Sequence, residues 1–429
     1  MNSLSSSVPL VGLLAGFVLA ATAAPAAEVV PSISLPDLVA AVTTGNPELK
    51  FYEAEVAAAR GGRQQAGSRG DTEVALEFGR KRVRDAAGGV AAEGGAWSVS
   101  VLQTFDWPGR LALRKALANQ QVTLAELGLE RFRSALAGRA RLLGYGLYAA
   151  QARADAIAEV AGRFAALKET LLARDPAGIT PLLEIRVIEA NELAIQRRAT
   201  EAQLAVAAAL VELNQLRGAA AEAPLRIAAT RSNLGELPSV EALLTAAYEN
   251  NFEFRLRRAE LEQQGFAVQL ARHERRPAIT AGPTVSGDNA GGGESFVGFS
   301  LSLPVAPAAR SRGAVEAAEA RRRQAEISLT LAQRELEKGV RLARLAYDTH
   351  LAEVRRWAPD SVGRFREAAE LADRHYRLAA VPIGTYVELQ QSYITAIEAL
   401  LDTERDALEA RLQLRDLTGL ALELAEAKP

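Results

Sequence analysis

The sequence predicts a mainly α-helical protein built from long coiled-coil helices, with a smaller β part of four strands. Hydrophobic residues make up 49% of the chain but aromatic residues only 5%, and such an Ala- and Leu-rich composition favours long packed helices. No proline occurs from Gly109 to Asp175, which as one helix would be on the order of 100 Å long at ~1.5 Å per residue. The second half of the chain also repeats the landmarks of the first in the same order.

The composition excludes several classes of protein. With 50 Lys and Arg against 52 Asp and Glu, the net charge is −2, so we expect no nucleic-acid partner, because binding to a phosphate backbone usually needs a basic excess. The chain has no Cys and one Met, the initiator, which excludes disulfides and soft sulfur ligands. Its three His are scattered, and we find no phosphate-binding loop or nucleophile motif. We therefore predict no enzyme activity, no cofactor and no metal site.

Residues 1–26 resemble a secretory signal peptide. An apolar run extends from Val8 to Ala27 and contains a small-residue cleavage site at 24–26. An uncleaved N-terminal membrane anchor is the alternative. No Cys lies at the cleavage point, so we expect no lipid anchor. No later apolar run approaches the ~18 to 20 residues of a transmembrane helix, so any membrane crossing by the mature chain is expected to use strands.

Two copies of one pattern follow, at 27–218 and 239–419, with a linker at 219–238 between them and a tail at 420–429. Each copy is expected to contain a helix, two strands, a long helix and a further helix.

Matched landmarks align these copies. Asn46, near the end of the first helix, falls on Asn251, and Gly218 falls on Gly419 at the ends of the copies. The repeat predicts that equivalent residues occupy equivalent structural positions.

Strands are expected at about 71–85 and 96–106 in the first copy and at about 277–287 and 295–304 in the second. Period-two alternation carries this prediction and gives each hairpin one apolar face. Strands of ~9 to 11 residues with such a face suit the wall of a transmembrane barrel, whereas a pair of soluble hairpins is the alternative. The residues that we expect to face lipid are Trp97, Val99, Val101, Val297, Phe299 and Leu301.

The helices that follow the hairpins carry heptad seams. Apolar and small residues recur at alternating steps of four and three over 389–417, and similar patterns occupy 195–216 and 329–354. This spacing predicts coiled-coil packing, with a generic amphipathic helix as the alternative. Pro359 is expected to break the long helix of the second copy.

Two turns that contain Pro and Gly, at 174–180 and 379–385, are expected at the far end of the helices from the strands. A carboxylate follows each turn, at Glu184 and Glu388. Each is either a solvated charge near a helix N-terminus or, if protomers assemble around an axis, part of an acidic ring that attracts cations. The residues from which a latch or gate could be built at this tip are Asp175, Asp373, Arg374, Tyr376 and Arg377.

The repeat and two sequence runs carry a resemblance to a known family. QTFDWPGR at 103–110 and PIGTYVELQQSYITAIEALLDT at 382–403 resemble the TolC family of outer-membrane efflux factors, over about residues 34–419. The run PIGTYVELQQ is similar to the heavy-metal, cobalt-zinc-cadmium branch of this family. The resemblance implies a homotrimer in which four strands per protomer form a 12-stranded barrel, continued by a helical tunnel through the periplasm.

The resemblance also implies a function and partners. It indicates an exit duct in the bacterial outer membrane, part of a tripartite RND-type efflux system with a periplasmic adaptor and an inner-membrane pump, that exports divalent heavy-metal cations. An acidic aperture would be formed by Glu184 and Glu388. The turn residues that would dock the adaptor are Pro176, Gly178, Ile179, Pro382, Ile383 and Gly384.

The sequence departs from the drug-efflux members at two positions. Gly384 stands where those members often have an Arg latch, and Gln391 stands in place of a second acid. The resemblance therefore does not carry over the same gating bonds.

Other functions remain as hypotheses. A duct for drugs, other small molecules or type I protein secretion would have the same fold. A periplasmic coiled-coil adaptor would instead place one helical hairpin between lipoyl-like and β-barrel halves, whereas this chain has two strand hairpins inside two helical copies.

Overall fold

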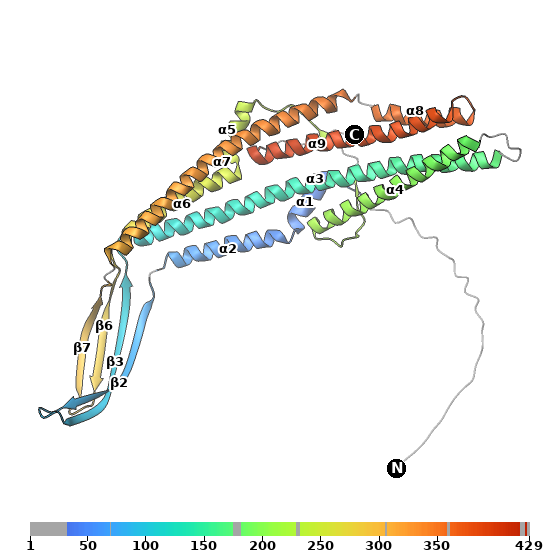
Figure 1. The fold of residues 1–429 in the computed structure, drawn as a ribbon. Helices are drawn as coiled ribbons and strands as arrows, with labels where there is room; N and C mark the ends of the chain where they lie inside the picture. Colours follow the sequence, from blue (N-terminus) through green and yellow to red (C-terminus); the bar gives the residue numbers. More distant parts are fainter. Residues whose placement is uncertain are drawn as a thin grey trace, which may run out of the picture.

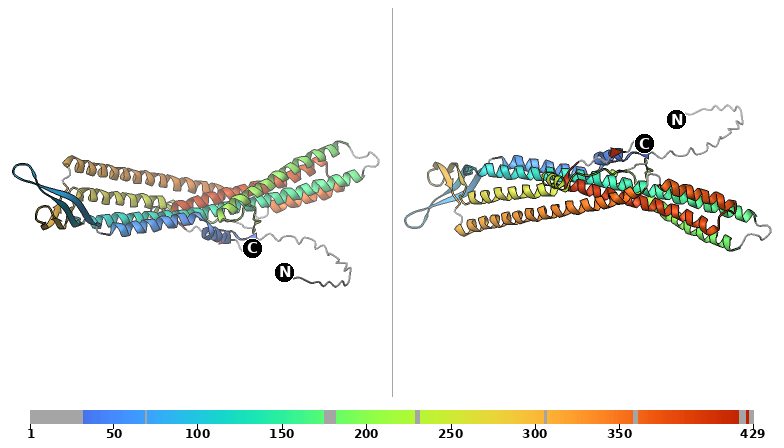
Figure 2. Two further views of the ribbon diagram at one scale, coloured as in Figure 1. Left: turned by 90° about the horizontal axis from the view of Figure 1, so that it is seen from below. Right: turned by 90° about the horizontal axis from the view of Figure 1, so that it is seen from above.

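The computed structural model describes residues 32–68, 70–174, 182–228, 232–304, 307–357, 361–420 and 425–426. The expected signal peptide at 1–26 lies outside these residues. Long helices run side by side along the molecule, and a small sheet projects from one end of them (Figure 1, Figure 2). The chain at 378–382, which joins the last two long helices, lies at the opposite end.

The first copy begins with a broken helix. Asn46 ends the first segment and Pro47 caps the next. Two strands, a very long helix and a return helix follow. The elements are α1 (Leu35–Gly45), α2 (Glu48–Ala66), β2 (Thr72–Arg84), β3 (Val90–Phe105), α3 (Arg110–Arg174) and α4 (Leu182–Arg217).

The second copy has the same order of elements, except that its long helix is divided. As expected, α7 ends before Pro359 and a new helix starts after it. The elements are α5 (Val240–Asn250), α6 (Phe252–His273), β6 (Ile279–Asp288), β7 (Glu294–Ser302), α7 (Ala308–Arg356), α8 (Ser361–Arg377) and α9 (Ile383–Thr418).

Short strands that the sequence does not predict bring distant segments together. Within the expected linker, β4 (Arg226–Ile227) pairs in parallel with β1 (Ser32–Ile33). Also in the linker, β5 (Ser232–Asn233) pairs with β8 (Ala425–Glu426) of the expected tail. Two-residue strands are too short to show a period of alternating hydrophobicity, so the sequence carries no signal for them.

Equivalent asparagines make the same contact in both copies. The Asn46 side-chain amide donates to the Leu216 carbonyl at 2.8 Å, and that of Asn251 donates to the Leu417 carbonyl at 3.0 Å. Both asparagines are buried. Each bond ties the break between the first two helices to the end of the last helix of its copy, so the repeat exists in three dimensions as well as in the sequence.

The α3 helix contains 65 residues, or about 98 Å at ~1.5 Å per residue, in agreement with the length expected from the missing prolines. The predicted seams form its contacts and those of its neighbours. Tyr393, Ala396, Ala407 and Leu414 of α9 are all buried, as coiled-coil packing requires.

None of the helices among the described residues combines the length and hydropathy needed to cross a bilayer.

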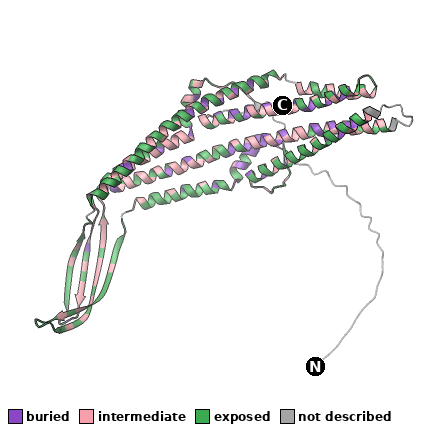
Figure 3. Ribbon diagram, viewed as in Figure 1, coloured by how far each residue is buried: buried purple, intermediate pink, exposed green. Residues whose placement is uncertain are grey.

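Two equivalent cores stabilise the middle of the molecule. Leu38 of α1 and Leu213 of α4 pack with α3 in one of them, and Leu243 of α5 and Leu414 of α9 pack with α7 in the other. Buried residues lie mainly along the helices, whereas the strands are mostly exposed or half-buried (Figure 3).

The four strands form one antiparallel sheet in the order β2-β3-β6-β7. β3 begins at Val90, earlier than the expected start at 96. The Asp85 carboxylate accepts hydrogen bonds from the backbone N–H groups of Ala87 and Gly89 and so closes a tight turn. Residues 90–95, which the expected strand bounds leave between the two strands, therefore belong to the sheet and pair with β2.

The ladder between β3 and β6 is interrupted near its middle. Ser100 pairs with Thr284, and the next pair is Gln103 with Ala281. Pro283 has no N–H to donate, and a Cβ added to Gly282 would lie only 1.8 Å from the Val101 carbonyl oxygen. Glycine is thus required where the two backbones approach most closely.

Candidate functional site: the exposed sheet face and the helical tip

One face of the sheet is apolar across all four strands. The pairing register places Leu76, Val99, Val285 and Val297 in one row across the sheet. Neighbouring rows contain the other residues that we expected to face lipid. Five of these six predicted residues are exposed: Val297 77%, Phe299 71%, Leu301 69%, Trp97 44% and Val101 41%. Only Val99 among the six is half-buried.

The opposite face of the sheet carries small and polar side chains. Ser98 pairs with Glu77 on one side and Ser286 on the other, and its hydroxyl donates to the Glu77 carboxylate at 3.1 Å. Thr104 and Thr280 lie within hydrogen-bond distance at 3.1 Å. The sheet is therefore amphipathic, with an apolar face that no described residue covers.

The run QTFDWPGR forms the joint between the sheet and the helices. The Trp107 indole donates to the Pro277 carbonyl at 2.7 Å. Arg110 forms an ion pair with Asp106 at 2.9 Å and donates to the carbonyls of His273, the last residue of α6, and Arg276 beyond it. Arg110 is buried, whereas its repeat equivalent Arg310 is exposed, so only the first copy uses this arginine to fix the sheet to the helices.

At the other end of the molecule, α3 and α4 pack against α8 and α9. Phe164, Ile188, Ala369 and Tyr386 are buried together in this cluster. A crevice of about 410 Å³ opens beside it, and Thr170, Glu184, Tyr376, Arg377 and the chain at 379–382 all line it. Four of the residues predicted at the tip and its turns, Glu184, Tyr376, Arg377 and Pro382, therefore meet in one place.

A hydrogen bond joins the two copies in this crevice. The Tyr376 hydroxyl of α8 donates to the Glu184 carboxylate in the first turn of α4, at 3.1 Å. Burial, together with this bond to a negative charge, raises the pKa of Tyr376 to about 12. Because the hydroxyl stays protonated far above neutral pH, it remains a donor to Glu184 under physiological conditions.

The two predicted acidic residues differ in their surroundings. Glu184 is half-buried and bonded to Tyr376, whereas Glu388 is exposed. The repeat places both near the start of a return helix, but only the first has a bonded partner among the described contacts. The equivalence seen in the sequence does not extend to their hydrogen bonds.

The other proposed latch residues do not all join helices. Arg377 binds Asp373 on its own helix at 2.9 Å and reaches Thr170 of α3 at 3.4 Å. Arg374 is exposed, with no hydrogen bond or ion pair within the described part of the chain. Asp175 lies outside the described residues.

A polar network near the tip is missed by the sequence analysis. Arg163 of α3 donates to Gln390 of α9 at 3.0 Å and forms an ion pair with Glu159 at 2.6 Å. Gln390 in turn donates to the Ala369 carbonyl of α8 at 2.7 Å. The network holds three helices together, and Arg366 joins it through Glu159 at 3.2 Å. The heptad pattern gives no signal for it, because Gln390 lies one position after the seam residue Leu389.

Gln391, one of the departures from the family pattern, bridges the two copies. Its amide donates to Asn191 of α4 at 3.2 Å. Further along the same helices, Arg198 forms an ion pair with Glu398 at 3.1 Å. Neutral and ionic bonds thus connect α4 to α9 below the tip.

The second predicted turn is well defined. Pro382 and Gly384 are exposed, while Ile383 packs against the tip core. Ala379 has a positive φ of 57°, a left-handed conformation that is unfavourable for a residue with a Cβ. The first turn, with Pro176, Gly178 and Ile179, lies outside the described residues.

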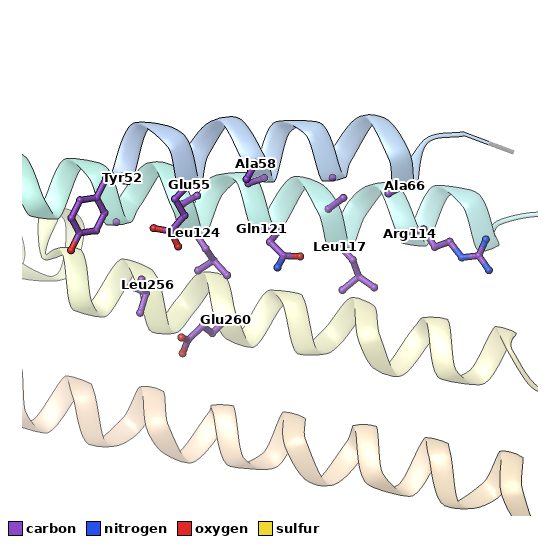
Figure 4. Close-up of a pocket in the computed structure, with 15 residues that line it drawn as sticks. Tyr52, Glu55, Ala58, Ala66, Arg114, Leu117, Gln121, Leu124, Leu256 and Glu260 are labelled. Atoms are coloured by element: carbon purple, nitrogen blue, oxygen red, sulfur yellow. The ribbon is translucent and has the colours of Figure 1, made fainter. Parts of the chain in front are cut away.

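A groove of about 850 Å³ runs along α2, α3 and α6 on the sheet side of the molecule (Figure 4). Leu117, Gln121 and Leu124 of α3 lie between α3 and α6, and Glu260 lies on α6.

Within the ranges that the structure describes, no group of three or more His, Cys, Asp or Glu side chains could hold a metal ion.

Solved structures resemble this arrangement over nearly the whole chain. A membrane protein from Pseudomonas aeruginosa matches at a TM-score of 0.73 and 19% identity, over 90% of each chain. The CmeC outer membrane channel of Campylobacter jejuni matches at 0.70 and 15%, over 92% of this chain and 87% of that one. CusC matches at 0.69 and 16%, over 90% and 92%. The chain has the fold of TolC-like outer-membrane channels.

This channel fold is the one that the sequence predicts, including the long helices and the four strands. The chain matches no protein-family model, and no curated protein matches it significantly. Because the structural matches share only 15 to 19% identity, they establish the fold and leave the cargo to be argued from the residues.

Proposed function

We propose that this protein is the outer-membrane exit duct of a tripartite efflux system, in which a periplasmic adaptor connects it to an inner-membrane RND pump. The observation that carries the proposal is the amphipathic four-stranded sheet at the end of the long helices. Its exposed apolar face suits lipid, and its polar face suits a water-filled lumen.

The open edges of this sheet support assembly as a homotrimer. β2 and β7 each pair on one side only within the described residues. Unpaired backbone groups are not tolerated in lipid, so a spanning sheet must close on itself. Three copies, each contributing four strands, give the 12-stranded barrel that the family resemblance implies, with Trp97, Val99, Val101, Val297, Phe299 and Leu301 facing lipid.

The helical tip would then be the periplasmic entrance. Around a threefold axis, Glu184 and Glu388 would each form an acidic ring, and such rings favour cations. Tyr376 would hold Glu184 in place. Because this hydrogen bond joins α8 to α4, it would also keep the tip closed. The exposed Pro382 and Gly384 support docking of the adaptor at the turns.

We infer that the cargo is divalent heavy-metal cations. The supporting observations are the resemblance of the 382–391 run to the heavy-metal branch and the acidic residues near the tip. Ions would pass through a wide aqueous duct without being coordinated by the chain, and selectivity would reside in the pump and adaptor. A duct for drugs or for protein secretion is the alternative.

Deleting the gene tests the cargo. We expect the strain to become hypersensitive to zinc, cobalt or cadmium ions and to recover when the wild-type gene is restored. Hypersensitivity to hydrophobic drugs without any change toward metals would support the alternative duct. Unchanged sensitivity to both, in a strain shown to produce the pump and adaptor, would contradict the efflux proposal.

A further inference from the structure

The longer hairpin carries a row of arginines beyond the apolar face. Along β2, the side chains of Leu76 and Phe78 lie on the apolar face, and alternation continues this face to Arg80, Arg82 and Arg84. Glu93 of β3 forms ion pairs with both Arg80 and Arg82, as residues on one face must. The arginines therefore lie on the outward side of the hairpin, at the end far from the helices.

The opposite side of the hairpin carries no excess positive charge. Lys81 binds Asp288 at 2.7 Å and Glu294 at 2.8 Å, which satisfies its charge across the sheet. On the outward side, three arginines face one carboxylate, that of Glu93, while the Asp85 carboxylate is engaged by the backbone of its own turn. Excess positive charge is confined to the outward side.

Exposure and an aromatic boundary mark where this basic row begins. Phe78 pairs with Trp97 across the strands, and the two are 82% and 44% exposed. Aromatic rings are enriched at the edge of a barrel's apolar band, where lipid headgroups start. The Arg80 side chain, one step further out, is 83% exposed, so the order along the strand is apolar, aromatic and then cationic.

We propose that this arginine row binds the phosphate groups of the phosphorylated glycolipid in the outer leaflet of the membrane. The inference rests on the proposed function, because it requires the apolar face to lie in that membrane. Clustered Lys and Arg at a membrane surface bind anionic headgroups, and arginine pairs well with phosphate. From Arg80 to Arg84 the row extends about 13 Å at ~3.3 Å per residue, long enough to reach more than one phosphate of the same headgroup.

Binding of purified lipid A to the detergent-solubilised full-length protein, followed by native mass spectrometry, tests this proposal. The probes are diphosphorylated lipid A, its dephosphorylated form and phosphatidylglycerol. We expect the wild-type protein to bind diphosphorylated lipid A with a Kd at least tenfold lower than either other lipid. Equal affinity for phosphatidylglycerol would overturn the assignment to the glycolipid.

The test variant is Arg80→Ser, Arg82→Ser and Arg84→Ser together. The matched control, Arg321→Ser, Arg322→Ser and Arg323→Ser, removes the same charge from exposed positions on α7. The hairpin variant should bind all three lipids equally, and the control should bind as the wild type does. A preference for diphosphorylated lipid A that survives in the hairpin variant, or is lost equally in the control, would overturn the proposal.

A variant that is expected to strengthen lipid binding provides a second test, because a misfolded protein would not bind more tightly. Glu93→Gln removes the acid that offsets Arg80 and Arg82, so it should lower the Kd for diphosphorylated lipid A several-fold. An unchanged or higher Kd would contradict the proposal.

Channel conductance separates this inference from the proposed function. A hairpin variant that conducts as the wild type does but has lost its lipid preference supports both, whereas a wild-type protein that binds lipid A but forms no channel contradicts the duct alone.

Discussion

The Tyr376 hydroxyl donates a hydrogen bond to the Glu184 carboxylate at 3.1 Å, and this bond joins the second copy of the repeat to the first at the end of the molecule far from the sheet. Tyr376 also stacks on the buried Tyr386, with ring centroids 5.5 Å apart. The donor is therefore held in place by the tip core.

Replacing Tyr376 by Phe removes the hydroxyl and keeps the ring. A hydrogen bond to a charged group contributes ~1.5 to 3 kcal/mol, and we expect about 1 kcal/mol here because the pair is only half-buried. The open fraction of reconstituted channels should rise several-fold. Single-channel recordings would measure it.

Tyr248→Phe is the matched control for this variant. Tyr248 also donates to a glutamate, Glu337, but does so between α5 and α7, outside the tip. Its recordings should match those of the wild type. Equal open fractions in Tyr376→Phe and wild-type channels would show that the bond does not hold the tip closed.

Glu184→Gln combined with Glu388→Gln tests the acidic aperture. Removing both carboxylates removes the negative potential that would concentrate cations at the entrance. We expect the reversal potential in a salt gradient to move toward zero. An unchanged reversal potential would eliminate the acidic rings as the source of selectivity.

Val99→Lys combined with Val101→Lys tests the orientation of the sheet. A lysine on the lipid side of a barrel costs ~2 to 4 kcal/mol at the bilayer midplane, so membrane assembly should fail. Ser98→Lys with Ser100→Lys is the matched control, because these positions lie on the same strand with their side chains on the polar face. Heat-resistant trimers from both variants would refute the lipid-facing assignment.

Gly282→Ala tests the close approach of β3 and β6. The added methyl group would meet the Val101 carbonyl oxygen at 1.8 Å, a distance that forces the strands apart. We expect a loss of folded protein in membranes, measured by protease resistance. Gly79→Ala, in the adjoining hairpin where a Cβ meets nothing within 4 Å, should fold normally, and normal folding of Gly282→Ala would show that the ladder can adapt.

Much of the fold could be predicted because its signals extend over long stretches. The absence of proline before Asp175 and the heptads around Leu414 each extend over many turns, so they identify α3 and α9 without knowledge of tertiary contacts. The alignment of Asn46 with Asn251 likewise anticipates two hydrogen bonds of the same kind.

The details of the tip could not be predicted in the same way. Sequence position brings Glu184 and Glu388 into equivalence, but Tyr376 binds only the first, because the bond depends on how two helical hairpins pack across the repeat. The network from Arg163 to Gln390 depends on the same packing. Such contacts join residues far apart in the chain, and no local pattern records them.

The most direct test of the proposed duct is single-channel conductance of the purified protein in a planar bilayer, after its mass in detergent has been measured. We expect a trimer that gives small, cation-selective conductance steps which divalent metal ions block. A monomer that stays soluble without detergent and gives no conductance would contradict the duct and favour a periplasmic adaptor instead.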